Sequence, residues 1–237
     1  MDLELLTQQV NNTKESVILQ NANNLVLLPT ENQNNSVLVT RIAGFDTSFG
    51  KKDPSIAVSC IVIYSDHKVV KLDTPYIPGF LAARELGPYL HLFQKIKDNP
   101  NLLPQLIFVD GNGILHPRKC GLASLLGVQL NIPTLGVSKN FLSFENLVYS
   151  NKSIKSKLLS IHSNDIRQLT IVGNDGFVYG MAFLPKGLVN PIYVSVGNLL
   201  SLDFAVLAVK KCSVYRIPEP IRQADHISRN IVHTLDL

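Results

Sequence analysis

The chain has 237 residues, 46% of them hydrophobic, and a formal net charge of +4, which suits one well-buried α/β domain and is compatible with a phosphate-rich partner. No apolar run approaches the ~18 residues of a membrane span, and the first ten residues carry acids where a secretory signal carries bases. Three widely spaced cysteines form no metal motif and cannot all pair, so we expect a reducing compartment, the cytoplasm or the nucleus.

The first third of the chain predicts one helix followed by three strands. Apolar residues recur at helical spacing over residues 1–20, and the Asn- and Gln-rich residues 20–36 predict a loop. Three apolar segments with strand character come next, at residues 37–46, 56–64 and 68–73. Because the links between these segments are short, we expect them to form antiparallel hairpins.

Residues 75–97 predict a helix with an apolar stripe along one side. Glu85 borders that stripe, at helical spacing from Tyr89 and Leu92. Pro88 lies inside the segment, and proline removes a helical hydrogen bond. We therefore expect either a kink at Pro88 or a helix that restarts with Pro88 in its first turn.

The centre of the chain predicts a strand, a turn, a helix and a second strand. The apolar residues 106–109 end on Asp110, and the turn 111–113 follows, with two glycines that allow positive φ and close approach of a backbone or ligand. His116 comes after this turn, and the second apolar strand leads to Lys139. Ligands of open α/β sheets bind outside the carboxyl ends of strands. We therefore expect Asp110, His116 and Lys139 to gather at one such edge.

The remaining elements complete a single α/β domain. Short helices and strands are predicted at residues 153–161 (basic, helical), 169–173, 177–184 and 192–196 (strands), and 201–211 and 219–232 (helices). The element order predicts a mixed sheet in which a strand ending on Asp46 lies beside the Asp110 strand at the centre. No repeat or second domain is visible, so we expect an N-terminal helix and Asn-rich loop at residues 1–36 and a core at about residues 37–232.

Carboxylates at these strand ends predict a metal site. Asp46, Asp110 and Glu85 would form an all-oxygen cluster, and three close anions repel one another unless a cation or protons intervene. Hard oxygen ligands favour Mg²⁺ or Mn²⁺. Such a site suits phosphodiester hydrolysis, because one metal can activate water and a second can stabilise the leaving oxygen. His116 and Lys139 would add donors near the developing negative charge.

Each of these residues also has an ordinary structural interpretation. Asp46 could open a turn, Glu85 could be a solvated helix residue, and His116 could be a satisfied loop histidine. Lys139 could simply face water at a strand end. The lysines at positions 152, 155 and 157 could form a solvated face or contact a nucleic-acid backbone. The single residues therefore leave the function open, and only their joint pattern narrows it.

Five ordered sequence blocks carry a resemblance to a known family. They extend from about Ile42 to Ala224 and read AGFDTSF, PYIPGFLAARE, VDGNGILHPRKCGLASLLGVQLNIPTLGVSKN, PIYVSVG and RIPEPIRQAD. This pattern resembles endonuclease V, the family of inosine- and deoxyinosine-specific endonucleases. The resemblance implies a ribonuclease H-like α/β fold with a mixed central sheet flanked by helices. It also implies Mg²⁺-dependent hydrolysis, with Mn²⁺ as a substitute, of the second phosphodiester bond 3′ to inosine in DNA or RNA.

The resemblance implies a role for each matching position. Asp46, Glu85 and Asp110 match the metal-binding and catalytic carboxylates, while His116 matches the active-site histidine and Lys139 the lysine near the scissile phosphate. A base must leave its stack before a pocket can bind it. The matching substrate positions form two groups, a wedge that fills the space left by the displaced base and a pocket that binds this base. The wedge is Tyr76, Ile77 and Pro78, and the pocket positions are Gly79, Leu81, Gly111, Leu122 and Gly136.

Two positions depart from the family's frequent pattern. Asn112 stands where DGHG has histidine, and Asn198 stands where histidine often follows VSxG. Asparagine cannot titrate near neutral pH, so rate or metal preference would differ if those histidines place metal or water. Two alternative functions stay open, a catalytically silent inosine-binding module and a nuclease of the same fold that targets branched structures. We expect a monomer without membrane association, and the choice between DNA and RNA stays open.

Overall fold

The computed structural model describes residues 3–20, 25–26, 37–54, 56–65, 68–76, 81–161, 167–185 and 187–235. Its helices are α1 (Leu3–Ser16), α2 (Leu81–Gln94), α3 (Leu122–Leu130), α4 (Asn151–Ser160), α5 (Leu202–Cys212) and α6 (Glu219–Thr234). Its strands are β1 (Leu25–Val26), β2 (Val37–Leu38), β3 (Ile42–Phe49), β4 (Ala57–Ser65), β5 (Lys68–Tyr76), β6 (Leu106–Asp110), β7 (Thr134–Ser138), β8 (Arg167–Val172), β9 (Val178–Leu184) and β10 (Ile192–Asn198).

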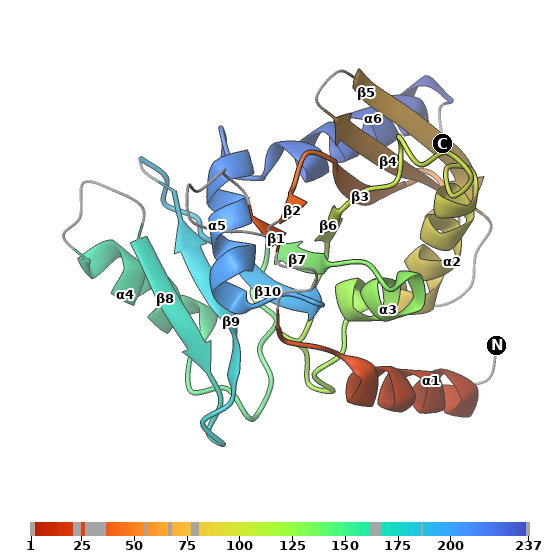
Figure 1. The fold of residues 1–237 in the computed structure, drawn as a ribbon. Coiled ribbons are helices and arrows are strands. Elements are labelled where there is room, and N and C mark those ends of the chain that lie inside the picture. Colours follow the sequence, from red (N-terminus) through yellow and green to blue (C-terminus); the bar gives the residue numbers. More distant parts are fainter. Residues whose placement is uncertain are drawn as a thin grey trace.

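One mixed sheet of eight strands organises the molecule (Figure 1). The strand order is β5-β4-β3-β6-β7-β10-β9-β8, with parallel pairing between β3, β6 and β7 and antiparallel pairing elsewhere. The predicted hairpins and the central pairing of the first core strand with the β6 strand are therefore confirmed. Within the described ranges, no helix is long and apolar enough to cross a membrane.

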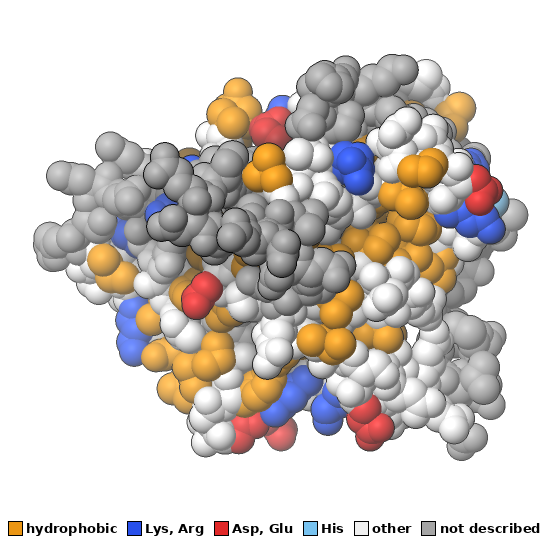
Figure 2. Space-filling model, in the orientation of Figure 1, with side chains coloured by type: hydrophobic (Ala, Val, Ile, Leu, Met, Phe, Trp, Pro, Cys, Tyr) orange, Lys and Arg blue, Asp and Glu red, His pale blue; other side chains and the backbone are white. Residues whose placement is uncertain are grey.

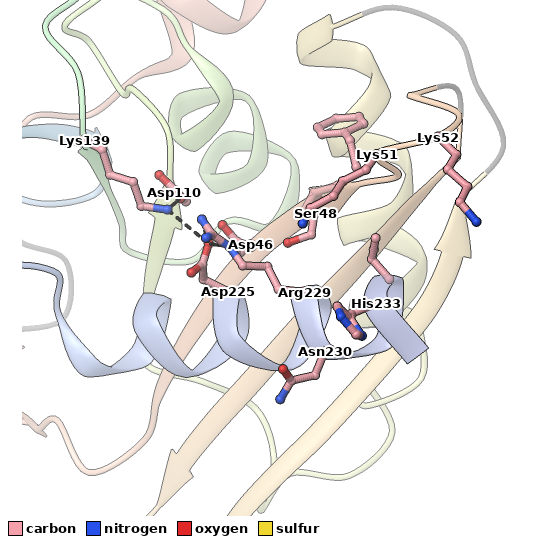
Figure 3. A pocket seen from close by; sticks show the side chains of 13 residues that line it. Asp46, Ser48, Lys51, Lys52, Asp110, Lys139, Asp225, Arg229, Asn230 and His233 are labelled. Carbon is pink, nitrogen blue, oxygen red and sulfur yellow. Dashed lines mark hydrogen bonds and ion pairs between the residues drawn. The ribbon is translucent and has the colours of Figure 1, made fainter. Parts of the chain in front are cut away.

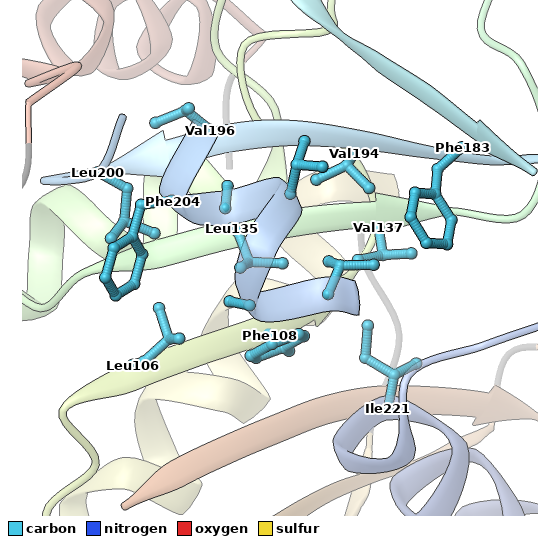
Figure 4. Close-up of a cluster of buried hydrophobic side chains, with 14 of the residues drawn as sticks. Leu106, Phe108, Leu135, Val137, Phe183, Val194, Val196, Leu200, Phe204 and Ile221 are labelled. Carbon is cyan, nitrogen blue, oxygen red and sulfur yellow. The ribbon is translucent and has the colours of Figure 1, made fainter. Parts of the chain in front are cut away.

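Two hydrophobic layers cover the two faces of the sheet. On one face, Phe108 of β6 and Val137 of β7 pack against α5 and against Ile221 of α6 (Figure 4). On the other face, side chains such as Val109 pack against α2 and α3, with Tyr89 among the buried residues. Successive strand residues point to opposite faces. The buried neighbours of a site residue in its strand therefore show toward which face its side chain points.

The first predicted core strand differs from the observed one. Residues 37–46 form β2, which pairs with β1, and the start of β3, which continues beyond Asp46 as far as Phe49. The prediction that Asp46 ends its strand is therefore wrong, because the antiparallel partner β4 keeps β3 extended to the Phe49–Ala57 pair. The parallel pairing of β3 with β6 nevertheless stops at the preceding residue, so Asp46 lies level with the end of β6.

Of the two alternatives predicted for Pro88, the restart is wrong, because α2 is one helix that contains Pro88, and the kink stays a prediction. Leu86, Tyr89 and Leu92 are buried in the core between the sheet and the helices α2 and α3. This packing stabilises the helix despite the hydrogen bond that proline removes. At the N-terminus α1 ends at Ser16, four residues earlier than predicted, and most of the predicted loop at residues 20–36 lies outside the described part of the chain.

Candidate active site

Three carboxylates meet where β6 ends. Asp46, Asp110 and Asp225 each offer an oxygen within 4.8 Å of the others. The Lys139 Nζ donates to Asp110 at 2.6 Å and to Asp225 at 3.2 Å (Figure 3). Asp46 is 3% exposed, and its carboxylate accepts a hydrogen bond of 3.0 Å from the Ser228 hydroxyl. One chain thus concentrates three acids and one lysine in a partly buried site.

The packing of α6 on β3 brings Asp225 to this site. Gly44 lies so close to α6 that a Cβ at this position would overlap the backbone of Pro220. Asp46 follows two residues later on the same strand, so its side chain points to the same face, toward α6. Asp225 lies one helical turn after Ile221, which is buried in the core beneath α6. Close helix–strand contact therefore sets the third carboxylate over Asp46 in β3 and over the end of β6.

Sequence analysis missed Asp225. The residue ends the RIPEPIRQAD block, and it is separated by helical spacing from the buried residues Ile221 and Ser228. Asp225 is an acid on the inward face of its helix, and it is the last residue of a block that matches the family. These two features could have identified Asp225 as a site residue. Among the described residues, the three-acid group contains Asp225 in the place where Glu85 was expected.

The electrostatics of the cluster favour a cation. Burial, followed by the hydrogen bond and charge of Asp110, raises the pKa of Asp46 to about 8 against the opposing charge of Lys139. For Lys139, burial alone would lower the pKa, but the carboxylates of Asp110, Asp46 and Asp225 outweigh burial and raise it. The lysine therefore stays charged, and a proton resides on the acid cluster near neutral pH. A hard divalent cation fits the same all-oxygen donor set and would replace that proton.

Glu85 and His116 line a second cavity, of about 340 Å³, together with Gly111, Asn112 and Leu122. Burial, and then the charge of Asp110, raises the pKa of Glu85 to about 7. The cavity that contains Asp110 and Lys139 is lined by other residues. The expectation that Asp110, His116 and Lys139 share one edge is therefore only partly met, because the turn after β6 carries His116 to the α2–α3 side.

Burial and one backbone contact favour the neutral form of the His116 imidazole. Burial, and then the charge of Arg118, lowers the pKa of His116. Its Nδ1 accepts a hydrogen bond of 3.3 Å from the backbone N–H of Arg118. In the neutral ring the proton must then reside on Nε2. His116 can therefore donate a hydrogen bond from Nε2 to an acceptor in the cavity.

The turn at the cavity floor requires glycine beneath it. A Cβ at Gly136 on β7 would overlap the backbone of the turn at residues 111–113. Gly136 thus lets the turn lie directly on the sheet. The Oδ1 atom of Asn112 is buried and has no hydrogen-bond partner among the described residues, and Asn112 lines the Glu85 cavity. Within the described part of the chain, this buried amide oxygen is therefore left unsatisfied beside the cavity.

The predicted wedge lies largely outside the described residues. Tyr76 ends β5 and Leu81 begins α2, whereas Ile77, Pro78 and Gly79 fall in the segment between them that is not described. The side-chain positions of Tyr76 and Leu81 are not described either. The substrate roles of these five positions therefore stay predictions.

The metal-free protein should lose stability as pH rises, because buried acids must ionise. The ordinary pKa of Asp46 is 3.8 and the folded value is about 8, so the folded state binds more protons than the unfolded state between these values. Stability then falls over this interval by up to about 1.4 kcal/mol per pH unit. Glu85, with a pKa of about 7, contributes with the same sign. Melting temperatures in EDTA from pH 5 to 9 should fall less steeply for Asp46→Asn, and equal slopes for both proteins would contradict this account.

Asn198 has a structural role that differs from the one considered from the sequence. It pairs with Thr134, at the opposite end of β7 from Lys139, so it lies far along the strand from the acid cluster. Its buried side chain accepts a hydrogen bond of 2.8 Å from the Ile18 N–H and donates one of 3.1 Å to the Gly127 carbonyl. Asn198 therefore ties the segment after α1 to α3.

Replacing Asn198 with leucine should destabilise the protein without changing its metal dependence. The Ile18 N–H would lose its partner and the Gly127 carbonyl would keep its backbone hydrogen bond from Ile132, at a cost of about 2 kcal/mol. Urea denaturation measures the stability change, and a Mg²⁺ titration measures the metal dependence. A shifted Mg²⁺ dependence at unchanged stability would instead support a role for Asn198 in placing metal or water.

Comparisons with known proteins identify relatives of this chain. The family model for Endonuclease V matches residues 21–226. Endonuclease V of Mus musculus is 38% identical over 203 residues, which are 81% of this chain and 60% of the mouse protein, so the match spans less than two thirds of that relative. Endonuclease V of Homo sapiens is 37% identical over 200 residues, which are 80% of this chain and 70% of the human protein.

Solved structures show the same fold. The crystal structure of human ENDOV superposes with a TM-score of 0.86 at 31% identity and covers 100% of both chains. A second structure is Ciona intestinalis Endonuclease V in complex with a 24mer DNA containing an inosine followed by a ribo-adenosine, with a TM-score of 0.84, 29% identity and 98% of each chain covered. The predicted ribonuclease H-like α/β architecture is thereby confirmed. On the match over most of its length, this chain belongs to the endonuclease V family.

Proposed function

We propose that this chain is a metal-dependent endonuclease that hydrolyses the second phosphodiester bond 3′ to inosine or deoxyinosine. The observation that carries the proposal is the cluster of Asp46, Asp110 and Asp225 beside Lys139. Membership of the family supports the reaction class. The inosine-containing DNA bound by the Ciona intestinalis relative supports the substrate class. A monomer suffices, because one chain supplies all three carboxylates.

The three aspartates would hold Mg²⁺, with Mn²⁺ as a substitute, because their donor set is all oxygen. Bound there, the ion would supply Lewis-acid activation of the attacking water and stabilise the leaving oxygen. The Lys139 ammonium, 2.6 Å from Asp110, would neutralise charge on the scissile phosphate. Glu85 would complete the catalytic and metal-binding set from the neighbouring cavity, where a pKa of about 7 lets it accept and release a proton near neutral pH.

The Glu85 cavity would receive the displaced base. His116 would donate from Nε2, and Gly111, Leu122 and Asn112 would contact the base. Gly136 would hold the turn in place from below. From the family resemblance, Gly79 and Leu81 complete the pocket, and Tyr76, Ile77 and Pro78 form the wedge that fills the space left by the base.

Cleavage of four end-labelled single strands in Mg²⁺ tests this proposal. Two strands are DNA and two are RNA, and one of each pair carries inosine and the other guanosine at the same position. We expect cleavage of the inosine strands and little cleavage of the guanosine strands. The ratio of rates on DNA and RNA would identify the preferred sugar, which a 2′-hydroxyl contact would decide. Binding without cleavage under Mg²⁺ or Mn²⁺ would favour a silent binding module. Equal cleavage of lesion-free branched DNA would favour a structure-specific nuclease.

A further inference from the structure

The acid cluster occupies one end of a cavity of about 690 Å³ whose other end is basic. Lys51 and Lys52 line that end from the connection between β3 and β4. Arg229 and His233 line it from the second half of α6 (Figure 3). We call these four residues the basic end. The three carboxylates at one end of this cavity can hold a metal ion, and the basic end can bind phosphates. The cavity therefore suits a nucleic-acid backbone that passes the acid cluster.

The basic end and the Glu85 cavity lie on opposite faces of the sheet. The Glu85 cavity is formed against α2 and α3, with Leu122 in its lining, whereas the larger cavity is formed against α6. Gly111 lines the first cavity and Asp110, the residue before it, lines the second. The end of β6 is therefore the ridge between them, and a strand that crosses this ridge passes the acid cluster.

The basic end gathers positively charged side chains in one cavity. On the face in Figure 2, the described basic and acidic side chains are interspersed with apolar and uncharged ones. At the basic end, by contrast, two lysines and an arginine line one cavity. Arg229 also contacts the cluster directly, since its Nε donates to Asp225 at 3.0 Å. Arg229 thus joins the acid cluster to the basic end of the same cavity.

We propose that the basic end binds backbone phosphates of the nucleotides on the 3′ side of the cleaved bond. This inference rests on the proposed function, which assigns the inosine base to the Glu85 cavity and the scissile phosphate to the acid cluster. Because the cleaved bond lies 3′ to the inosine, a strand that leaves the base cavity and crosses the ridge enters the larger cavity with its 3′ portion. Phosphate contacts carry no base information, so any sequence is accepted there.

A length series of substrates tests this direction. Strands share one inosine and one 5′ arm, and their 3′ arms end one, three or six nucleotides beyond the cleaved bond. For the wild-type protein, KM should fall as the 3′ arm lengthens. For Lys51→Gln/Lys52→Gln, KM on the longest strand should rise roughly tenfold, KM on the shortest should stay at the wild-type value, and the salt dependence should weaken by about 1.4 in log–log slope for two lost phosphate contacts.

The variant Lys95→Gln/Lys97→Gln is the matched control, because it removes the same charge from exposed positions after α2 that line neither cavity. It should keep the wild-type length series. A wild-type series in the Lys51→Gln/Lys52→Gln protein, or an equal rise in KM at all lengths, would overturn the inference while leaving inosine cleavage intact. A loss that follows the length of the 5′ arm would show that the strand runs the other way. Failure of the wild-type protein to cleave any inosine strand would instead overturn the proposed function.

Discussion

Replacing Asp110 with asparagine is expected to lower the cleavage rate of an inosine strand by at least about 10³-fold, which corresponds to ~4 kcal/mol of barrier. The amide keeps the shape of the side chain but removes one charge from the three-acid cluster. It also removes the negative charge that faces Lys139, whose Nζ lies 2.6 Å from Asp110. Single-turnover rates with Mg²⁺ at saturating enzyme measure the effect on the chemical step.

The exposed residue Asp203 gives a matched control for this change. Asp203→Asn alters the same functional group on α5, outside both cavities, and should cleave at the wild-type rate. The Asp110→Asn protein should still bind the inosine strand, because the Glu85 cavity is unchanged. Wild-type turnover in Asp110→Asn would show that the acid cluster does not hold the catalytic metal.

Replacing Asp225 with asparagine is expected to raise the Mg²⁺ concentration required for half-maximal rate and to lower the rate about 10²-fold, ~2.7 kcal/mol, at limiting Mg²⁺. Asp225 contributes one of the three close carboxylates and contacts both Lys139 and Arg229. Its loss weakens the donor set without emptying it, so high Mg²⁺ should restore part of the rate. A metal titration of the single-turnover rate measures both quantities.

The comparison with Glu85→Gln decides which acid is the third ligand. If Asp225 holds the metal, Asp225→Asn shifts the Mg²⁺ titration and Glu85→Gln mainly changes the pH profile of the rate. The opposite result would support the ligand set predicted from the sequence, with Glu85 beside Asp46 and Asp110. Asp98→Asn, an exposed isosteric change outside both cavities, should leave the titration unchanged.

Local patterns predicted most of the fold. Short apolar runs marked β6 and β7, and their parallel pairing follows from the α3 crossover between them. Asp110 could be predicted as a site residue because it directly follows a buried apolar run and ends its strand. The true end of β3, beyond Asp46, could not be predicted from the sequence. Pairing with β4 extends β3 to Phe49, and the residues of one strand do not show how far its pairing continues.

The missed parts of the site depend on contacts between distant segments. Asp225 reaches Asp46 only because α6 packs on β3, and that contact joins Gly44 to Pro220. The role of Asn198 depends on Ile18 and on the carbonyl of Gly127, neither of which is near it in the chain. Periodicity assigns a residue to a face but does not say which distant element covers that face.

The most direct test is the metal dependence and position of the cut in one end-labelled strand with a single inosine. With Mg²⁺ we expect one product, ending one nucleotide 3′ to the inosine, and with EDTA we expect the intact strand. We expect this dependence because the cluster of Asp46, Asp110 and Asp225 offers an all-oxygen donor set that fits a divalent cation. The same product in EDTA, or cuts spread along the strand and in a guanosine control, would contradict the account.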